Sequence, residues 1–241
     1  MSQFEPKLTL LGHLQELRRR LIISVIAVAI GAVVAFIFYE WIFYILTYPA
    51  SDIEFTAIEM TERMSSIMLV SIAGGIILAM PVLIYQAIMF VAPAMTGQEK
   101  KWVYIIVPWI FLMFLLGVAF GYFMLAPWTI WFLYNFGSDV AVMFPRISNY
   151  ISFLTKLLLM TGLIFEFPVV TTFLTRIGVL KPEWLSGKRS IAIVLSFIIA
   201  AVITPPDPIT QLLLAIPLVL LYEMSIILAK AVYRRRQPVE A

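Results

Sequence analysis

Six long apolar segments, separated by short polar stretches, dominate the hydrophobic pattern of the chain. They cover approximately Leu21–Phe38, Ser66–Ala92, Trp102–Ala126, Ile151–Leu174, Ser190–Ile203 and Gln211–Ala229. A helix needs about 20 apolar residues to cross the roughly 30 Å hydrocarbon core of a bilayer. The first four segments are long enough, so the pattern predicts an all-α membrane protein with six transmembrane helices.

The fifth segment is shorter than the others. It ends after about fourteen residues, at the run Thr204–Pro208, which contains three prolines that no helix crosses unbroken. We therefore expect the fifth and sixth segments to form a short hairpin that crosses where the bilayer is locally thinned.

Prolines also lie inside four of the apolar segments, at Pro81, Pro108, Pro168 and Pro217. Each removes a backbone hydrogen bond and bends its helix, which favours a concave, curved wall of kinked helices. The alternative is that these prolines reflect only the general abundance of proline in transmembrane helices.

The basic residues predict the orientation of the chain. With the N-terminus inside, the outer loops carry only Arg63 and Arg146, and Lys156 lies just within the fourth span. The inner segments carry the other fourteen, namely Lys7, Arg18, Arg19, Arg20, Lys100, Lys101, Arg176, Lys181, Lys188, Arg189, Lys230, Arg234, Arg235 and Arg236. This bias follows the positive-inside rule and places both termini in the cytoplasm.

We interpret the chain as a single integral membrane domain. Residues 1–20 form a cytoplasmic amphipathic helix, because Leu10, Leu14 and Leu17 recur at helical spacing. Residues 21–229 hold the six spans, and residues 230–241 form a basic cytoplasmic tail. The polar start lacks the pattern of a cleavable signal peptide, so we expect the first span to be retained.

Composition agrees with a membrane protein and narrows the chemistry. Hydrophobic residues make up 62% of the chain and charged residues 13%, and the mean hydropathy is +0.99. The chain has no cysteine, and His13 is its single histidine, which excludes disulfides and makes a zinc site untenable. We expect no metal, no cofactor, no nucleic-acid partner and no enzymatic activity.

Glu166 is the most informative residue, because it lies alone in an apolar run between Phe165 and Phe167. A charged group in mid-membrane costs roughly 2.5–3.5 kcal/mol on insertion, and such groups usually face a bundle interior or a wet cavity. Glu166 therefore predicts a functional polar site at mid-depth. Glu223 is a second acid of this kind, but it lies closer to the cytoplasmic end, where it can reach the interface.

Two further acids lie among basic residues on the predicted cytoplasmic side. Glu16 precedes three arginines, and Glu99 precedes Lys100 and Lys101. Glu16 has two interpretations: an ordinary pair with Arg20 four residues on, or a carboxylate available to an incoming cation. Glu99 is either a solvated loop residue or part of the same site.

Four motifs in order resemble the TatC family, the polytopic receptor subunit of the twin-arginine protein translocase. They are His13-Leu14-x-Glu16-Leu17-Arg18-x-Arg20, Phe90-x-Ala92-Pro93 with Glu99, Phe165-Glu166-x-Pro168, and Thr204-Pro205-Pro206-Asp207. Each motif is weak alone, but together they cover essentially the whole chain.

The resemblance implies a function and a set of partners. It implies a receptor in the inner (cytoplasmic) membrane of a prokaryote that binds signal peptides with paired arginines on folded cargo. The family works with the single-span subunits TatA and TatB, self-associates in the bilayer, and uses the proton-motive force without a nucleotide site.

The resemblance also assigns residues. It implies that Glu16 and Glu99, with Arg18 and Phe90, bind the signal peptide. It implies that Glu166 is the intramembrane polar site, and that Pro49 and Asp207 are functional residues of the outer loops.

Two other functions remain open at this point. A proton-coupled secondary transporter would use Glu166 and Asp207 as proton carriers, although the chain shows no clear internal repeat. A scaffold without a recognition role would leave Glu16 and Glu99 inert. An intramembrane enzyme is disfavoured, because no nucleophile–base pair, metal-ligand cluster or phosphate-binding loop is present.

Overall fold

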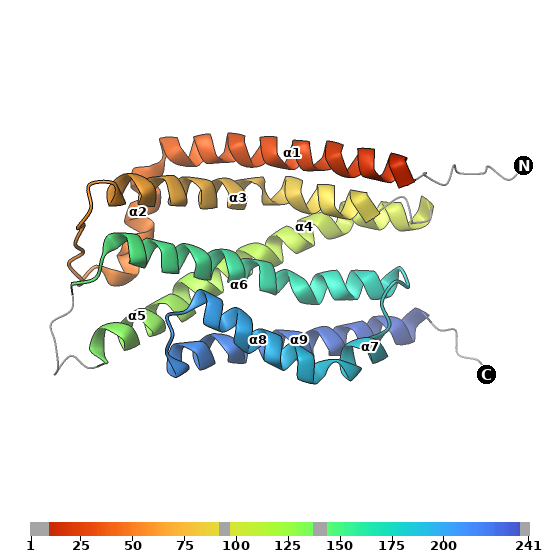
Figure 1. The fold of residues 1–241 in the computed structure, drawn as a ribbon. Coiled ribbons are helices and arrows are strands. Elements are labelled where there is room, and N and C mark those ends of the chain that lie inside the picture. Colours follow the sequence, from red (N-terminus) through yellow and green to blue (C-terminus); the bar gives the residue numbers. More distant parts are fainter. Residues whose placement is uncertain (1–9, 92–96, 137–143, 237–241) are drawn as a thin grey trace, which may run out of the picture.

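The computed structural model describes residues 10–91, 97–136 and 144–236, and in these ranges the chain is almost entirely helical (Figure 1). The elements are α1 (Leu10–Ile37), α2 (Tyr39–Thr47), η1 (Tyr48–Ala50), α3 (Glu62–Val91), α4 (Gly97–Phe120), η3 (Gly121–Leu125), α5 (Ala126–Asn135), α6 (Ile147–Arg176), α7 (Pro182–Gly187), α8 (Arg189–Ile203) and α9 (Pro208–Arg236). The all-α prediction is confirmed.

Five of the described helical stretches are long and apolar enough to span a membrane, and α8 is a shorter apolar helix. α4, η3 and α5 follow one another without a break and form a single candidate span, Ile106–Asn135. The turn η3 is wider than an α-helix. It precedes Pro127, which has no N–H to donate, and wider turns are a common response to such a gap.

The prediction for the last hairpin is half wrong. The fifteen residues of α8 are about 22 Å long and stay below spanning length, as expected. The sixth segment, by contrast, belongs to the 29-residue helix α9, about 44 Å long. Its apolar pattern understated its length, because the helix continues through polar residues at both ends.

From Leu10 onward, the predicted N-terminal amphipathic helix and the first span form one helix, since α1 runs from Leu10 to Ile37 without interruption. The rest of that predicted helix, residues 1–9, lies outside the described residues. At the other end of the chain, α9 continues to Arg236 and so includes the first residues of the predicted basic tail.

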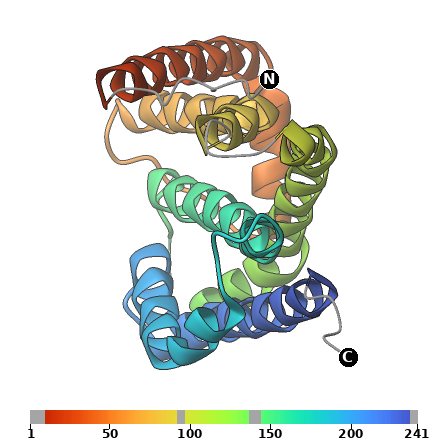
Figure 2. The ribbon, with the colours of Figure 1, turned by 90° about the vertical axis from the view of Figure 1, so that its right-hand side faces the viewer.

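The helices follow a curved line across the molecule (Figure 2). α1 packs on α3, α3 on α4 and α6, α6 on α4 and α9, and α9 on α8. In the end-on view α1 and α3 lie at one side, α8 and α9 at the other, and α6 lies between them. This open arrangement agrees with the curved wall expected from prolines that lie inside α3, α4, α6 and α9.

The two ends of the molecule differ in character. The start of α1, the start of α4 and the end of α9 lie at one end, together with α7 (Figure 1). We call this the basic end. α2, η1, the end of α5 and the start of α6 lie at the opposite end, which we call the loop end.

Close backbone contact joins α4 to α6 at the centre of the molecule. A methyl group added at Gly117 would lie 2.5 Å from the carbonyl oxygen of Thr161 and 2.8 Å from the Cα of Gly162. Such small residues let transmembrane helices approach closely and gain packing energy.

We predict that Gly117→Ala destabilises the protein by about 1–3 kcal/mol, because the added methyl must push backbone atoms apart. Thermal unfolding of the detergent-solubilised chain measures the effect. Gly187→Ala is the matched control, because nothing lies within 4 Å of the added methyl there. Equal stability of the two variants would contradict the proposed crossing of α4 and α6.

Candidate functional site

Glu16 lies near the start of α1 and is paired with Arg20 one turn further along the helix. The Nε of Arg20 donates to Glu16 Oε1 at 3.1 Å, and its Nη1 donates to Gln86 Oε1 of α3, also at 3.1 Å. The side chains of Arg20 and Glu16 are only 18% and 22% exposed. The ordinary interpretation of Glu16 as an intrahelical pair is therefore confirmed, with Gln86 as a third member.

The pair does not remove Glu16 from use. Both side chains remain partly exposed, and Glu16 accepts from Arg20 through Oε1 alone, so a second cation can approach the carboxylate. Gln86 holds Arg20 against α3. The two backbones come close together about 16 Å further along the helices, where Gly31 of α1 meets Gly75 of α3.

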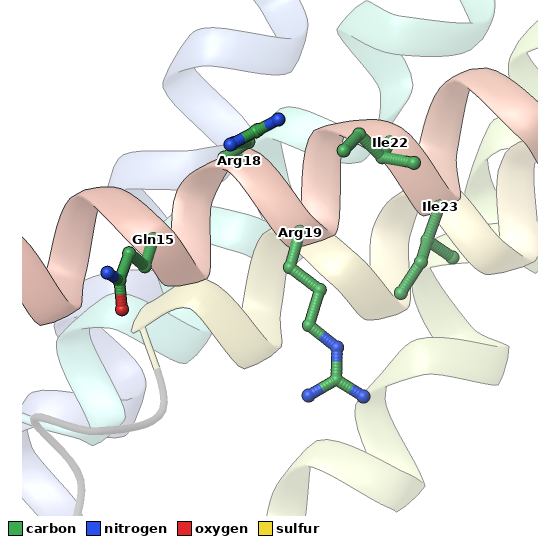
Figure 3. Close-up of a pocket in the computed structure, with 5 residues that line it drawn as sticks. All are labelled: Gln15, Arg18, Arg19, Ile22 and Ile23. Carbon is green, nitrogen blue, oxygen red and sulfur yellow. The ribbon is translucent and has the colours of Figure 1, made fainter.

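Arg18 and Arg19 lie outside this pair. They line a surface hollow of about 600 Å³ on α1 together with Gln15, Ile22 and Ile23. Figure 3 shows the two guanidinium groups extending from α1 in different directions. Residues two apart on a helix do not share a face, so the structure does not bring Arg18 to the side chain of Glu16.

Phe90 and Glu99 lie at the same end of the molecule as Glu16. Phe90 is half-buried near the end of α3, one helical turn beyond Gln86. Glu99 lies in the first turn of α4, but its side chain is outside the described part of the structure, as is Pro93. The structure thus places Glu16, Gln86 and Phe90 along one α1–α3 edge of the basic end.

Glu166 lies two thirds of the way along α6. Its Oε1 is buried and has no hydrogen-bond partner among the described residues. The neighbouring rings mark its position: Phe165 contacts Phe120 of α4, with ring centroids 5.3 Å apart, and Phe167 stacks on Tyr222 of α9 at 5.7 Å. A buried oxygen without a partner is costly. On α6 the Thr155 hydroxyl shares this condition, but the carboxyl group of Glu166 is the more costly of the two to bury.

The second intramembrane acid differs from Glu166. Glu223 of α9 pairs with Arg189 at the start of α8, with 2.8 Å between Arg189 Nε and Glu223 Oε1. Glu223 thus has a partner that joins α8 to α9 at the basic end, and its expected reach to the membrane interface stays a prediction.

Asp207 caps the first turn of α9. Its Oδ1 accepts a hydrogen bond of 2.7 Å from the backbone N–H of Thr210, and its Oδ2 accepts one from the Thr210 hydroxyl. With Pro208 as the first helical residue, this is a complete N-cap. The same acid that the resemblance assigns to function therefore has a structural role.

A set of contacts that the sequence did not predict joins the segment before α3 to the segment before α6. Arg146 donates from Nε to Glu62 Oε1 at 2.6 Å, and its Nη2 lies 3.1 Å from Glu59 Oε1. Beside them, the Thr56 N–H donates to the Pro145 carbonyl at 3.1 Å. The hydrogen bonds to Glu62 and then Glu59 raise the pKa of the Arg146 guanidinium above its ordinary value.

The sequence held only part of the signal for this cluster, because the burial of Glu62 is known from the structure alone. Glu62 begins a long apolar helix yet is almost completely buried, and a buried acid requires a partner. Arg146 is one of two basic residues in the predicted outer loops, so it was an obvious candidate partner for Glu62.

Comparisons with known proteins identify the family of the chain. Residues 12–217 match the family model described as Sec-independent protein translocase protein (TatC). Curated relatives of that name are 40% identical in Desulforapulum autotrophicum, over 98% of this chain and 89% of the relative, and 40% identical in Aquifex aeolicus, over 95% and 97%.

The chain belongs to the TatC family.

A solved structure of a TatC protein, titled a twin arginine translocase receptor, has the same fold. It superimposes with a TM-score of 0.84, at 40% sequence identity, and covers 91% of this chain and 99% of the solved chain. The chain is therefore a multi-pass membrane component of the Sec-independent protein translocase. TatC membership also removes the support for a secondary transporter, because the relatives are named as translocase components.

The cap at Asp207 gives a prediction that separates structure from function in this TatC protein. Asp207→Ala should lower the free energy of unfolding by about 0.5–2 kcal/mol, because two groups of the first turn of α9 lose their acceptor. Asp207→Asn should keep most of the stability, since asparagine is also a good N-cap. Denaturant unfolding in detergent measures both.

The same pair of variants tests the role of the charge. If Asp207→Asn is stable but abolishes protein transport, the carboxylate itself is required and the capping explanation is insufficient.

Proposed function

We propose that the chain is the signal-peptide receptor and core subunit of the twin-arginine translocase. Three observations support this proposal: the membership of the TatC family, the likeness to a structure whose title calls it a receptor, and the half-buried Glu16 beside Gln86 at the basic end. The last observation carries the assignment to a site.

The basic end faces the cytoplasm in this proposal. The described chain at this end carries the basic residues Arg18, Arg19, Arg20, Lys100, Lys101, Arg176, Lys181, Lys188, Arg189, Lys230, Arg234, Arg235 and Arg236. Positively charged loops remain on the cytoplasmic side during insertion. The orientation places both termini in the cytoplasm and the chain in the inner membrane of a prokaryote, and it puts Glu16 where a signal peptide arrives.

Recognition of paired arginines rests on Glu16 and Glu99. A guanidinium group forms planar, bidentate hydrogen bonds with a carboxylate that a lysine ammonium does not reproduce. Glu16 already holds such a group, Arg20. A signal arginine therefore exchanges with a side chain of the same chemistry, which keeps the energetic cost of binding and of release small.

The apolar part of the signal peptide supplies most of the affinity in this proposal. Exposed ion pairs contribute only about 0.2–1 kcal/mol each, whereas burial of apolar surface contributes about 25 cal/mol per Å². Phe90 lies next to the Glu16 site and offers an aromatic surface for the first apolar residues of the signal. Arg18 lies on another face of α1 than Glu16, so in this proposal it contacts the signal peptide at the edge of the site and not at its centre.

Glu166 is the place where a partner helix contributes a polar group. The single-span subunits TatA and TatB pack against this chain in the proposal, and the bilayer-facing sides of α4, α6 and α9 are the surfaces open to them. Transport is driven by the proton-motive force, and the complex contains more than one copy of the chain.

We predict that a labelled signal peptide with paired arginines binds the detergent-solubilised chain, and that a twin-lysine peptide binds more weakly by up to about thirtyfold, because each of the two lost bidentate pairs costs up to about 1 kcal/mol. The double variant Glu16→Ala/Glu99→Ala should lose this discrimination. Fluorescence anisotropy measures both affinities.

The control is Glu183→Ala, which removes an acid of the first turn of α7 at the basic end, away from α1. Equal binding of both peptides, unaffected by the double substitution, would overturn the assignment of this site.

We further predict that Glu166→Ala and Glu166→Gln reduce protein transport and the crosslinking of single-span partners to α6, since both remove the carboxylate at mid-depth. Glu223→Gln is the control, because its acid pairs with Arg189 at the basic end. Unchanged transport and crosslinking in the Glu166 variants would show that this carboxyl group does not serve partner binding.

A further inference from the structure

The loop end contains a cavity of about 310 Å³ between the η1 segment and the last turns of α5. Its floor is apolar, made by prolines and isoleucines that include Pro49 and Pro127. Two hydrogen bonds fix the neighbouring helix α2: the hydroxyls of Tyr122 and Tyr150 each donate at 2.7 Å to carbonyl groups of its last turn. The cavity is thus lined by η1 and α5 as well as by loop residues, and the neighbouring helix α2 is fixed by hydrogen bonds.

The charge of the cavity favours a cation. Asp52 is the one ionisable acid among its lining residues, and no lysine or arginine lines it. Trp131 and Tyr134 of α5 line the same cavity as Asp52, with 62% and 39% of their surface exposed. An acid flanked by exposed aromatic faces is a common arrangement for binding an ammonium group, which is attracted by the charge and by the ring electrons.

A second hollow adjoins the first and is entirely apolar. It has a volume of about 380 Å³ and is lined by Pro127, Trp128 and Trp131, two of which also line the cavity with Asp52. The rings of Trp128 and Trp131 meet edge to face, with centroids 6.4 Å apart. Trp128 lies seven residues before Asn135, about 10 Å deeper along the helix, so the apolar hollow lies on the membrane side of the acidic one.

We propose that the two hollows together bind one phospholipid with a primary ammonium headgroup, that is, a phosphatidylethanolamine. The ammonium group lies against Asp52 between the rings of Trp131 and Tyr134, and an acyl chain covers Pro127 and Trp128. The aromatic residues place the site at the level of the lipid headgroups, where tryptophan and tyrosine concentrate in membrane proteins.

The neighbouring apolar hollow decides between possible occupants. A lysine side chain of another protein would pair with the Asp52 carboxylate but would leave the apolar surface of Trp128 exposed. An anionic lipid would cover Trp128 but would bring its charge next to Asp52. A lipid whose headgroup carries an ammonium group places a cation at Asp52 and an acyl chain over Trp128.

Native mass spectrometry of the full-length chain, incubated with equal amounts of phosphatidylethanolamine and phosphatidylglycerol of the same acyl chains, tests the proposal. We expect retention of one phosphatidylethanolamine in preference to phosphatidylglycerol. Asp52→Asn should reduce this retention by up to about fivefold, the factor that corresponds to an exposed ion pair of about 1 kcal/mol. Equal retention of the two lipids by the unsubstituted chain would overturn the proposal.

Matched variants separate this site from general effects of charge and hydrophobicity. Glu54→Gln removes an exposed acid from the same loop without touching the cavity, and it should leave retention unchanged. Trp131→Leu should weaken retention, whereas Trp41→Leu, an exposed tryptophan of α2, should not.

The acyl-free headgroup glycerophosphoethanolamine tests the apolar half, and we expect it to bind far more weakly than the lipid. Retention that Asp52→Asn and Trp131→Leu leave intact, or equal binding of the acyl-free headgroup, would also overturn the proposal.

Discussion

The lack of water in the hydrocarbon core is the constraint on which the rest of this structure depends. Each buried N–H, C=O and hydroxyl group must find a partner within the protein, and here most side-chain hydroxyls find it in their own helix. Thr161, Thr171, Thr175, Ser196 and Ser225 each donate to the carbonyl four residues earlier. This local solution leaves the helices free to pack through apolar and small residues.

The buried polar groups that lack such a partner are therefore informative. Among the described residues, Ser66, Thr155 and Glu166 hold buried side-chain oxygens without a hydrogen bond. A hydroxyl at such a position is a modest cost, but a carboxyl group is a large one. Glu166 is therefore the most costly of the three to leave unpaired, and the proposed contact with a partner helix rests on this residue.

The features that could be predicted from the sequence are those that follow from residue spacing along a helix or from the length of an apolar segment. The apolar segments gave the helices, the proline run at Thr204–Pro208 gave the short α8, and the spacing of Glu16 and Arg20 gave their pair. It misjudged α9 because charged residues such as Arg234 can lie on a helix beyond the apolar core by extending toward water. Arg146 and Glu62, 84 residues apart, share no period, so the sequence offers Arg146 only as one of two basic residues in the outer loops, and the structure shows which acid it pairs with.

The limited packing of α1 has a consequence for how the protein assembles. Only 11% of its apolar window is buried, and its main neighbour is α3. Since α1 precedes α3 in the chain, it can enter the lipid before that neighbour is made, and its long apolar sequence suits it to be stable there alone, as in two-stage assembly of membrane proteins. α3 in turn must await α4 and α6. The helices can thus assemble in the order in which they occur in the chain, and later helices pack on surfaces that earlier helices expose.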